Sequence, residues 1–232
     1  MVYTEYMHFR KQQLLKYIIE AHIKTASPVG SGLISEKYMK DVSSPTVRNE
    51  MQELEREGLI MQPHTSAGRI PTEAGYRNYI ESMGQKDLSE KCRQEIDTVF
   101  HQSKDPVEKI KNVAKIAADI SENAAVVAFG KHDVYYTGLS NLFSKPEFSN
   151  QNIVVNMSQV IDHLDEVMAA LSGMLDNDVS VLLGSDNPFG LECGSVLSKS
   201  SKGIMFGILG TIRMDYEKNI GLVKYIKHLL EK

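Results

Sequence analysis

Residues 43–79 constrain the fold of this chain more than any other segment, because helix and hairpin signals follow one another there in a fixed order. Ser44 followed by Pro45 is typical of a helix start, since serine accepts a hydrogen bond from a free backbone N–H and proline fits the first helical position. Three apolar residues at helical spacing predict one buried face, namely Val47, Met51 and Leu54. Gly58 marks the predicted end of this helix.

A β-hairpin is predicted directly after that helix. Residues 59–61 and 69–70 are short strand candidates, and the small residues HTSAG between them are typical of a turn. Thr72 then predicts the cap of a further helix that begins TEAGYRNYI.

Two more helices are predicted ahead of this segment. Residues 9–24 carry a wide apolar stripe at helical spacing, TASPVGSG breaks the pattern, and residues 33–39 form a short second helix. Three helices followed by a two-stranded hairpin are the parts of a winged helix-turn-helix. We therefore expect residues 1–84 to form a winged-helix DNA-binding domain.

Four polar side chains are predicted on the outer face of the helix that starts at Ser44, namely Thr46, Arg48, Asn49 and Gln52. Arginine pairs with the edge of guanine, and asparagine and glutamine pair with adenine, so this face suits the major groove of double-stranded DNA. The alternative is a solvated polar face, which is common on surface helices. Arg69 beside Gly68 predicts a close approach of the hairpin to the DNA backbone or minor groove, whereas we expect a structural role for His64.

The charge of the chain limits how such a domain binds DNA. The whole chain has a net charge of −4, and residues 1–84 contain ten Lys or Arg and ten Asp or Glu. A neutral domain lacks the basic surface that gives strong non-specific binding, so a few well-placed cations and base contacts have to supply the affinity. The same neutrality favours a rival role, a scaffold that uses this domain for protein contacts.

Cysteine content and hydropathy indicate a cytoplasmic protein. Cys92 and Cys193 lie far apart without CxxC spacing, which argues against a disulfide framework and a zinc site. Apolar runs fall short of the ~20 residues that span a bilayer. The first residues, MVYTEYMHFRKQQ, are too polar for a signal peptide. We expect no contact with a membrane.

A polar linker, QKDLSEK, follows Gly84, and two helices are predicted after it, over residues 88–102 and 106–122. Asp105 and Pro106 are typical of a helix start. The second helix carries an apolar stripe made of Ile110, Val113, Ala117 and Ile120. This stripe is either a core face or the seam of a dimer, and we assign residues 85–124 to a helical linker or dimerisation region.

Residues 125–232 alternate between strand and helix patterns, which is typical of an α+β domain. Strands are predicted over residues 125–129, 134–137 and 179–183, and residues 191–199 and 203–209 are expected to pair as a hairpin across SKSSKG. Helices are predicted over residues 158–171 and 215–230, on one side of the sheet.

Catalysis is not expected of this chain. His163 has three acidic neighbours, namely Asp162, Asp165 and Glu166. On a helix they would share an exposed face, which favours a solvated charged surface over acid–base or metal chemistry. The turn over residues 185–190 has too few carboxylates for calcium, and the chain has no Walker loop, HExxH or GxSxG motif. We predict no catalytic residue, no metal site and no cofactor.

The segment SPTVRNEMQELEREGLI followed by QPHTSAGRIPTEAGYRNY resembles the signature of the HrcA family of bacterial heat-inducible transcription repressors. Two later segments resemble further parts of that family in the same order, VYYTGLSNLFSKPEF and FGILGTIRMDYEKNI. The resemblance implies that ten residues lie at the DNA, with Ser44, Pro45, Thr46, Arg48, Asn49 and Gln52 on or near the major groove and Thr65, Ser66, Gly68 and Arg69 in the wing.

The resemblance also implies a partner and a regulated activity. Members of the family are homodimers that bind an inverted-repeat operator upstream of chaperone operons, are released on heat stress, and depend on the chaperonin supply of the cell. A GAF-like fold is implied for residues 125–232. The chain departs from the family between Asn123 and Tyr135, where members generally carry a long additional segment used in dimerisation. A metabolite-responsive winged-helix regulator of other genes is the alternative function.

Overall fold

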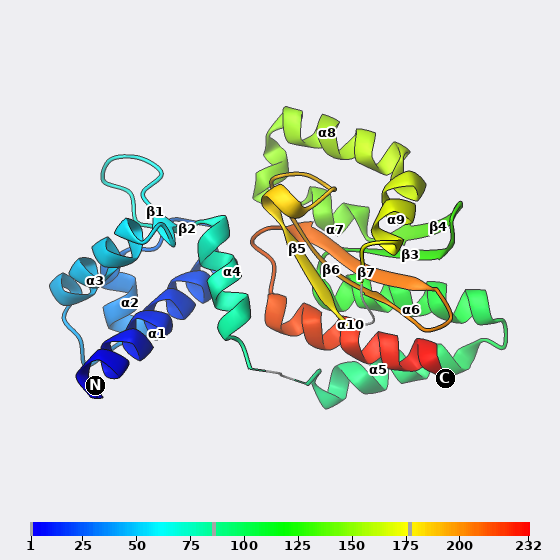
Figure 1. Cartoon of the computed structure of the whole chain (residues 1–232), viewed down its shortest axis with the longest axis horizontal. Helices are drawn as coiled ribbons and strands as arrows, with labels where there is room; N and C mark the ends of the chain where they lie inside the picture. The colour runs from blue at the N-terminus through cyan, green and yellow to red at the C-terminus, as the bar shows by residue number, and fades with distance from the viewer. Residues whose placement is uncertain (1, 85–86, 176–177) are drawn as a thin grey trace. The chain divides into compact units, whose positions relative to one another are not determined.

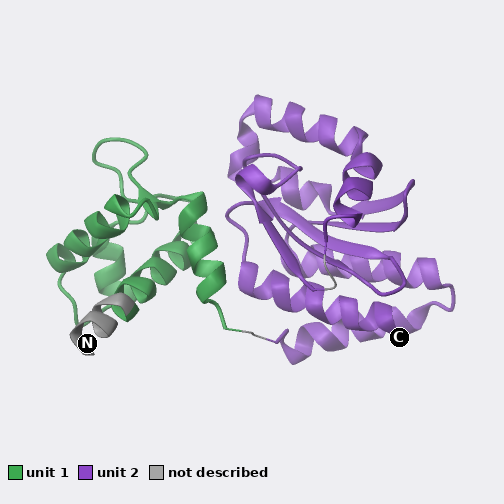
Figure 2. Ribbon diagram, in the orientation of Figure 1, with its two compact units in different colours: residues 1–84 green, residues 85–232 purple. Residues whose placement is uncertain are grey.

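The computed structural model describes residues 2–84, 87–175 and 178–232 and divides the chain into two compact units (Figures 1 and 2). Unit 1 ends at Gly84, and unit 2 extends from residue 85 to Lys232. The start of the expected linker, residues 85 and 86, lies outside the described residues. Each unit buries its own set of apolar side chains.

Unit 1 consists of helices and a short hairpin in the expected order. Its elements are α1 (Val2–Thr25), α2 (Ser31–Lys37), α3 (Ser44–Arg56), β1 (Ile60–Met61), β2 (Ile70–Pro71) and α4 (Glu73–Ser82). The two strands are antiparallel, with Ile60 opposite Pro71. The predicted cap of α4 is confirmed, because the Oγ1 atom of Thr72 accepts a hydrogen bond from the backbone N–H of Gly75 at 3.1 Å.

The core of unit 1 forms where α1 and α3 bury their apolar faces. Val47, Met51 and Leu54 of α3 are at most 3% exposed, as their spacing predicts. Leu14 and Ile18 of α1 are fully buried. Burying an apolar side chain of this size stabilises a fold by ~1.5–3 kcal/mol, so these contacts fix the rotation of α3 about its axis. The opposite face of α3 is therefore turned outward.

Helix α3 begins with a different cap from the one that the sequence predicts. The Oγ atom of Ser43, rather than that of Ser44, accepts a hydrogen bond from the backbone N–H of Thr46 at 3.4 Å. Ser44 is the first helical residue, and its Oγ atom lies 3.0 Å from the Oγ atom of Ser31 at the start of α2. This bond links the first turns of α2 and α3, and local sequence cannot reveal it because the two serines approach only after folding.

Unit 2 contains a five-stranded antiparallel sheet in the order β4-β3-β7-β6-β5. Its strands are β3 (Ala124–Gly130), β4 (Asp133–Thr137), β5 (Ser180–Leu183), β6 (Cys193–Lys199) and β7 (Met205–Thr211). Its helices are α5 (Glu90–Gln102), α6 (Pro106–Ser121), α7 (Leu139–Phe143), α8 (Gln151–Asp162), α9 (Leu164–Ser172) and α10 (Tyr216–Glu231), with 3-10 turns η1 (Pro146–Ser149) and η2 (Gly184–Asp186). The predicted α+β class and the β6–β7 hairpin are confirmed, and the sheet is consistent with a GAF-like domain.

Helices cover both faces of the sheet, whereas the sequence pattern predicts helices on one side (Figure 1). α6 and α10 pack on one face, and α7 and α9 pack on the other. Within β3, Val126 joins the core beneath α7–α9, while Ala125 and Val127 are fully buried on the opposite face. A strand buried on both faces reads as a continuous apolar run rather than as an alternation, and AAVVAF is such a run.

The helices expected to form a linker or dimerisation region belong to unit 2, and α6 packs on β3. Ile110, Val113 and Ala117 are at most 7% exposed within the single chain and Ile120 is half-buried, so most of the apolar stripe of α6 is a core face. The predicted start of α6 is confirmed by Asp105, whose side chain accepts a hydrogen bond from the backbone N–H of Glu108 at 2.7 Å.

The single helix predicted over residues 158–171 is two helices, α8 and α9. The chain breaks at His163, whose φ of −115° and ψ of 27° lie outside the helical region. The ring of His163 is exposed, with Nδ1 3.6 Å from the Oε1 atom of Glu166. His132 approaches Asp165 at 3.2 Å, and this hydrogen bond holds the pKa of Asp165 below its usual range. These contacts fit the solvated charged surface that the sequence favours.

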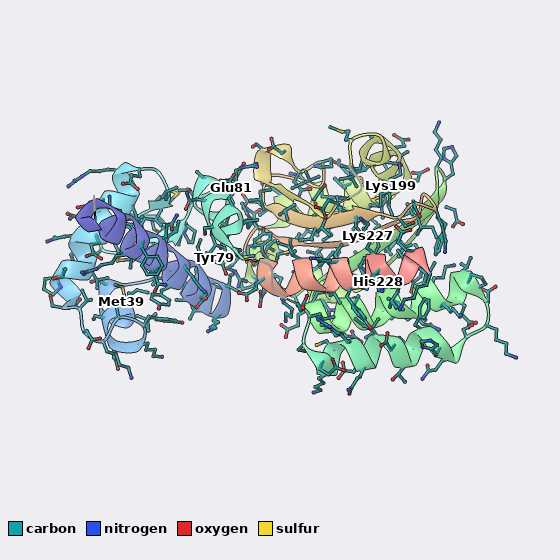
Figure 3. All side chains as sticks on the ribbon, turned by 60° about the horizontal axis from the view of Figure 1, so that its bottom comes forward. Met39, Tyr79, Glu81, Lys199, Lys227 and His228 are labelled. Atoms are coloured by element: carbon teal, nitrogen blue, oxygen red, sulfur yellow. The ribbon has the colours of Figure 1, made fainter. Side chains whose placement is uncertain are left out.

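A side-chain hydrogen bond joins two layers of unit 2 that lie far apart in the sequence. Lys199, labelled in Figure 3, donates from Nζ to the backbone carbonyl of Ser172 at 2.8 Å and joins the end of β6 to the end of α9.

None of the helices in the described ranges is long and apolar enough to cross a membrane. Over residues 2–84, 87–175 and 178–232, no group of three His, Cys, Asp or Glu side chains is placed to hold a metal ion.

A partly buried ion pair joins η1 to the end of the sheet. The Nε atom of Arg213 donates to the Oε1 atom of Glu147 at 2.7 Å, and the two side chains are 10% and 22% exposed. Burial on its own would raise the pKa of Glu147, but the hydrogen bond and charge of Arg213, with a hydrogen bond from Thr211, hold this pKa below its usual range. The segments VYYTGLSNLFSKPEF and FGILGTIRMDYEKNI therefore meet in space through this pair.

Replacing Arg213 by Ala should destabilise unit 2, because the carboxylate of Glu147 stays largely buried without its cation. We expect a loss of ~1–3 kcal/mol in the free energy of unfolding at neutral pH, measured by urea denaturation followed by circular dichroism. The matched control is Lys145→Ala, which removes a more exposed pair with Glu122 at 4.0 Å and should change stability by less than about 0.5 kcal/mol.

The same pair predicts how stability depends on pH. Because the pKa of Glu147 is lowered by folding, its contribution is present above the pKa that it has in the unfolded chain and is lost as the pH falls through the lowered value. Burial without Arg213 raises the pKa of Glu147 in the variant, so the difference between the parent and Arg213→Ala should shrink on acidification, beginning above about pH 4 and continuing below it. A difference that stays constant from neutral pH to that range would contradict the role given to this pair.

Candidate nucleic-acid interface

Helix α3 presents the polar face that its spacing predicts. Thr46, Arg48, Asn49 and Gln52 are all exposed. Arg48 forms no ion pair within the described parts of the chain, so its guanidinium group is available to a ligand. The face is positioned by the burial of the opposite side of α3, and a rigid helix holds its donors in a fixed arrangement.

The carboxylates on the side of α3 that faces α1 are paired with cations. The Nη2 atom of Arg10 lies 2.6 Å from the Oε1 atom of Glu50. The Nζ atom of Lys11 lies 2.9 Å from the Oε2 atom of Glu53 and 2.8 Å from the Oε1 atom of Glu57, just beyond the end of α3. Glu50, Glu53 and Glu57 are thus directed toward α1 and away from the exposed polar face.

The pairing between α1 and α3 favours the charged form of both partners. Hydrogen bonds to Glu57 and Glu53 raise the pKa of Lys11, and the hydrogen bond from Lys11 lowers the pKa of Glu53. Both groups are therefore charged at neutral pH. The contribution of Glu53 is lost only as the pH falls through its lowered pKa, on the acid side of the ordinary range for glutamate.

Backbone hydrogen bonds hold the base of the hairpin against the segment before α2. The N–H of Val29 donates to the carbonyl of Arg69 at 2.8 Å, and the N–H of Arg69 donates to the carbonyl of Val29 at 2.9 Å. A Cβ atom on Gly68 would lie 2.5 Å from the carbonyl carbon and oxygen of Val29. The close approach that requires glycine is therefore one between two backbones of this chain, whereas the sequence suggests an approach to DNA.

The side chain of Arg69 is turned toward α3. Its Nε atom donates to the Oε2 atom of Glu55 at 3.0 Å, and its Nη2 atom lies 2.9 Å from the same oxygen. The Arg69 side chain is 17% exposed and that of Glu55 is 33% exposed. A residue predicted to contact DNA thus has an ionic partner within the chain.

The tip of the hairpin is exposed and tightly turned. The N–H of Ala67 donates to the carbonyl of His64 at 3.0 Å, and Ser66 has a φ of 69°, in the left-handed region that serine seldom adopts. His64, Thr65 and Ser66 are all exposed. His64 therefore supports the turn through its backbone carbonyl, while its side chain is in contact with solvent.

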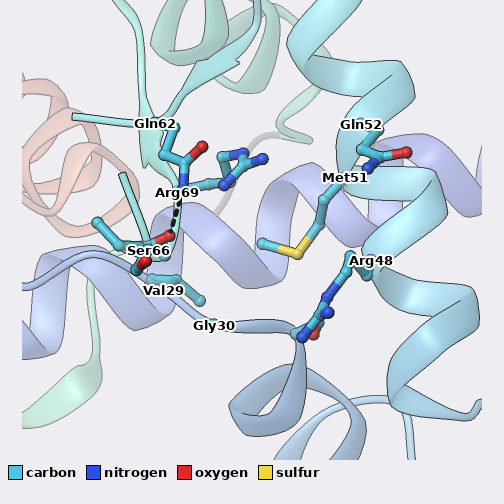
Figure 4. A pocket seen from close by; sticks show the side chains of 11 residues that line it. Val29, Gly30, Arg48, Met51, Gln52, Gln62, Ser66 and Arg69 are labelled. Carbon is cyan, nitrogen blue, oxygen red and sulfur yellow. Dashed lines mark hydrogen bonds between the residues drawn. The ribbon is translucent and has the colours of Figure 1, made fainter. Parts of the chain in front are cut away.

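A hollow of about 460 Å³ lies between α3 and the hairpin (Figure 4). Arg48 and Gln52 line it from α3, and Ser66, Gly68 and Arg69 line it from the hairpin. Half of the residues predicted to contact DNA therefore surround one hollow. Both sides of the hollow present nitrogen and oxygen atoms that can donate and accept hydrogen bonds.

The other predicted residues lie outside the lining of this hollow, namely Ser44, Pro45, Thr46, Asn49 and Thr65. Gln62 lines the hollow although the sequence did not indicate it. Its Nε2 atom donates to the backbone carbonyl of Ala67 at 3.0 Å and braces the hairpin. A single glutamine before a proline carries no distinctive signal, and only the path of the hairpin brings it to this place.

Residues 75–220 match the family model described as the HrcA protein C terminal domain. A heat-inducible transcription repressor HrcA from Caldanaerobacter subterraneus subsp. tengcongensis is 40% identical over 128 residues, which are 53% of this chain and 36% of that relative. Another from Desulforamulus reducens is 56% identical over 85 residues, which are 36% of this chain and 24% of that relative. The aligned stretches span only about a third or less of these curated relatives.

A solved structure also resembles this chain. It is the crystal structure of a protein described as hypothetical, with a TM-score of 0.79, 16% sequence identity, and coverage of 96% of this chain and 97% of that one. At this identity the likeness concerns the fold alone.

Replacing Gly68 by Ala should destabilise unit 1, because the added methyl group meets the backbone of Val29 and forces the hairpin base away from α2. We expect a cost of ~1–3 kcal/mol in the free energy of unfolding, measured by thermal or urea denaturation. Gly32→Ala is the matched control, since no atom lies within 4 Å of its added Cβ and alanine favours the helix α2. Equal stability of the two variants would contradict the close backbone approach.

Proposed function

This chain belongs to the HrcA family, and on that premise we propose that it is a transcriptional repressor that binds double-stranded DNA through α3 and the β1–β2 hairpin. The observation that carries the proposal is the distribution of charge on α3. Its exposed face holds Arg48, Asn49 and Gln52, while its carboxylates are paired with cations of α1 and of the hairpin. Such a face offers donors to base edges and no free carboxylate to the phosphates.

In this proposal unit 1 works as a winged helix-turn-helix. Helix α3 enters the major groove, where Arg48 pairs with guanine and Asn49 and Gln52 pair with adenine. Ser44, Pro45 and Thr46 lie at the start of α3, where short side chains and backbone groups reach the phosphates. The exposed hairpin tip, with Thr65 and Ser66, follows the sugar–phosphate backbone.

We further propose that the repressor is a cytoplasmic homodimer that binds the inverted repeat of a chaperone operator. A two-fold axis places two α3 helices in half-sites about one helical turn apart, roughly 34–36 Å, and the bound dimer excludes polymerase. Heat releases the repressor through loss of the binding-competent fold or of support by a chaperonin. The relatives' name, heat-inducible transcription repressor, supports the regulatory part of this proposal.

A gel-shift titration tests the proposed function directly. The full chain is titrated with a duplex that carries the inverted repeat of a chaperone promoter and with a scrambled duplex of equal base composition, at two salt concentrations. We expect the inverted repeat to bind roughly a thousandfold or more tightly than the scrambled duplex. Equal affinity for both duplexes would refute the proposal that this protein is an operator-specific repressor.

Substitution of Arg48 tests the role of α3. If Arg48 reads a guanine, Arg48→Ala should cost ~1–3 kcal/mol in operator binding and relax the preference at a single base pair. Arg48→Lys keeps the charge but loses the planar fork, so it should retain binding to scrambled DNA and lose most of that preference. An Arg48→Ala variant that binds the operator like the parent would remove Arg48 from the recognition set.

A further inference from the structure

The geometry of the hairpin assigns Arg69 a role different from contact with DNA. We propose that Arg69 is a positioning residue, which holds the hairpin against α3 and neutralises Glu55 on the side of α3 that faces DNA. This inference rests on the proposed function of unit 1. It concerns how the hairpin is held against α3, so this part can be tested on the protein without DNA.

Arg69 is held by contacts on two sides. Its backbone N–H and carbonyl both pair with Val29, at 2.9 and 2.8 Å, and these bonds fix it to the segment before α2. Its guanidinium group reaches Glu55 of α3 with two nitrogens, at 3.0 and 2.9 Å from one carboxylate oxygen. The next residue, Ile70, pairs with Met61 in the hairpin. Arg69 is thus the residue at which the hairpin, the α2 segment and α3 meet.

The position of Glu55 explains why this pairing matters for DNA. Arg48, Gln52 and Glu55 are spaced i, i+4 and i+7, so they follow one another along the same side of α3. Arg48 and Gln52 line the hollow beside the hairpin. A free carboxylate next to them would repel the phosphates of a duplex bound there. Arg69 cancels this charge.

The exposure of Arg69 also argues against a phosphate contact. Only 17% of its side chain is exposed, and two of its nitrogens are occupied by Glu55. A phosphate would compete with Glu55 for the guanidinium group, and any movement toward the phosphate would expose the carboxylate beside the DNA. The gain from one contact would be offset by the repulsion that the movement creates.

We call the contact of Arg69 with Glu55 the clamp, because it holds the hairpin base against α3. Replacing either residue by glutamine tests the clamp without DNA. Arg69→Gln and Glu55→Gln each break the ion pair, and amide hydrogen exchange reports whether the hairpin base opens more readily. We expect the N–H of Arg69, or of the glutamine in its place, to exchange roughly three- to tenfold faster in both variants. Arg77→Gln is the matched control, because Arg77 pairs with Glu73 at 2.7 Å on α4. Unchanged exchange in both variants would overturn the clamp, whatever the protein binds.

Operator binding by the same variants then distinguishes positioning from direct contact. If Arg69 touches a phosphate, Arg69→Gln should lower the slope of log K against log salt by roughly 0.9, and the second substitution Glu55→Gln should not restore it. In our proposal affinity falls on the order of tenfold, and the slope falls as well because salt screens the repulsion between the freed carboxylate and the phosphates. Glu55→Gln then recovers most of both by removing the exposed carboxylate. A lowered slope without recovery would overturn the positioning role.

The two experiments also separate this inference from the proposed function. A parent protein that binds operator and scrambled duplexes equally would refute the repressor function, while the exchange measurement would still report on the clamp. Conversely, specific operator binding by the parent together with unchanged exchange would leave the function standing and refute the clamp.

Discussion

The pairing of the carboxylates of α3 with cations from two other elements is the interaction on which the rest of unit 1 depends. Glu50 and Glu53 pair with α1, and Glu55 pairs with the hairpin. Because Arg10 and Lys11 lie on α1, the same ion pairs that hold α1 to α3 also remove negative charge from the surface. Unit 1 can therefore be neutral overall and still present an exposed face of α3 without an unpaired carboxylate.

The local parts of this arrangement follow from the sequence. Apolar spacing at Val47, Met51 and Leu54 predicts which side of α3 is buried, and therefore which side carries Arg48 and Gln52. The parts that could not be predicted all depend on segments far apart in sequence. The bond between Ser31 and Ser44, the pair of Arg69 and Glu55, and the hollow lined by Gln62 exist only when the chain has folded, and no periodic pattern encodes them.

In unit 2 the sequence pattern likewise predicts the strands better than it predicts how helices are arranged around the sheet. The continuous apolar run of β3 indicates a strand that is buried on both faces, and such a strand requires helices on both sides of the sheet. The prediction of helices on one side does not take this run into account. The break at His163 leaves no signal in the periodicity, because α8 and α9 both carry apolar residues at helical spacing. Periodicity identifies helical residues better than it identifies a change of helix direction.

The close backbone approach at Gly68 divides the hairpin into a fixed base and a less constrained tip. Residues 68 and 69 are fixed by the chain's own backbone, whereas the turn from His64 to Ala67 extends into solvent and is closed by a single backbone hydrogen bond. Insertions and exchanges are tolerated best at exposed loop tips of this kind. The fold therefore constrains the length and side chains of the tip much less than it constrains the base of the hairpin.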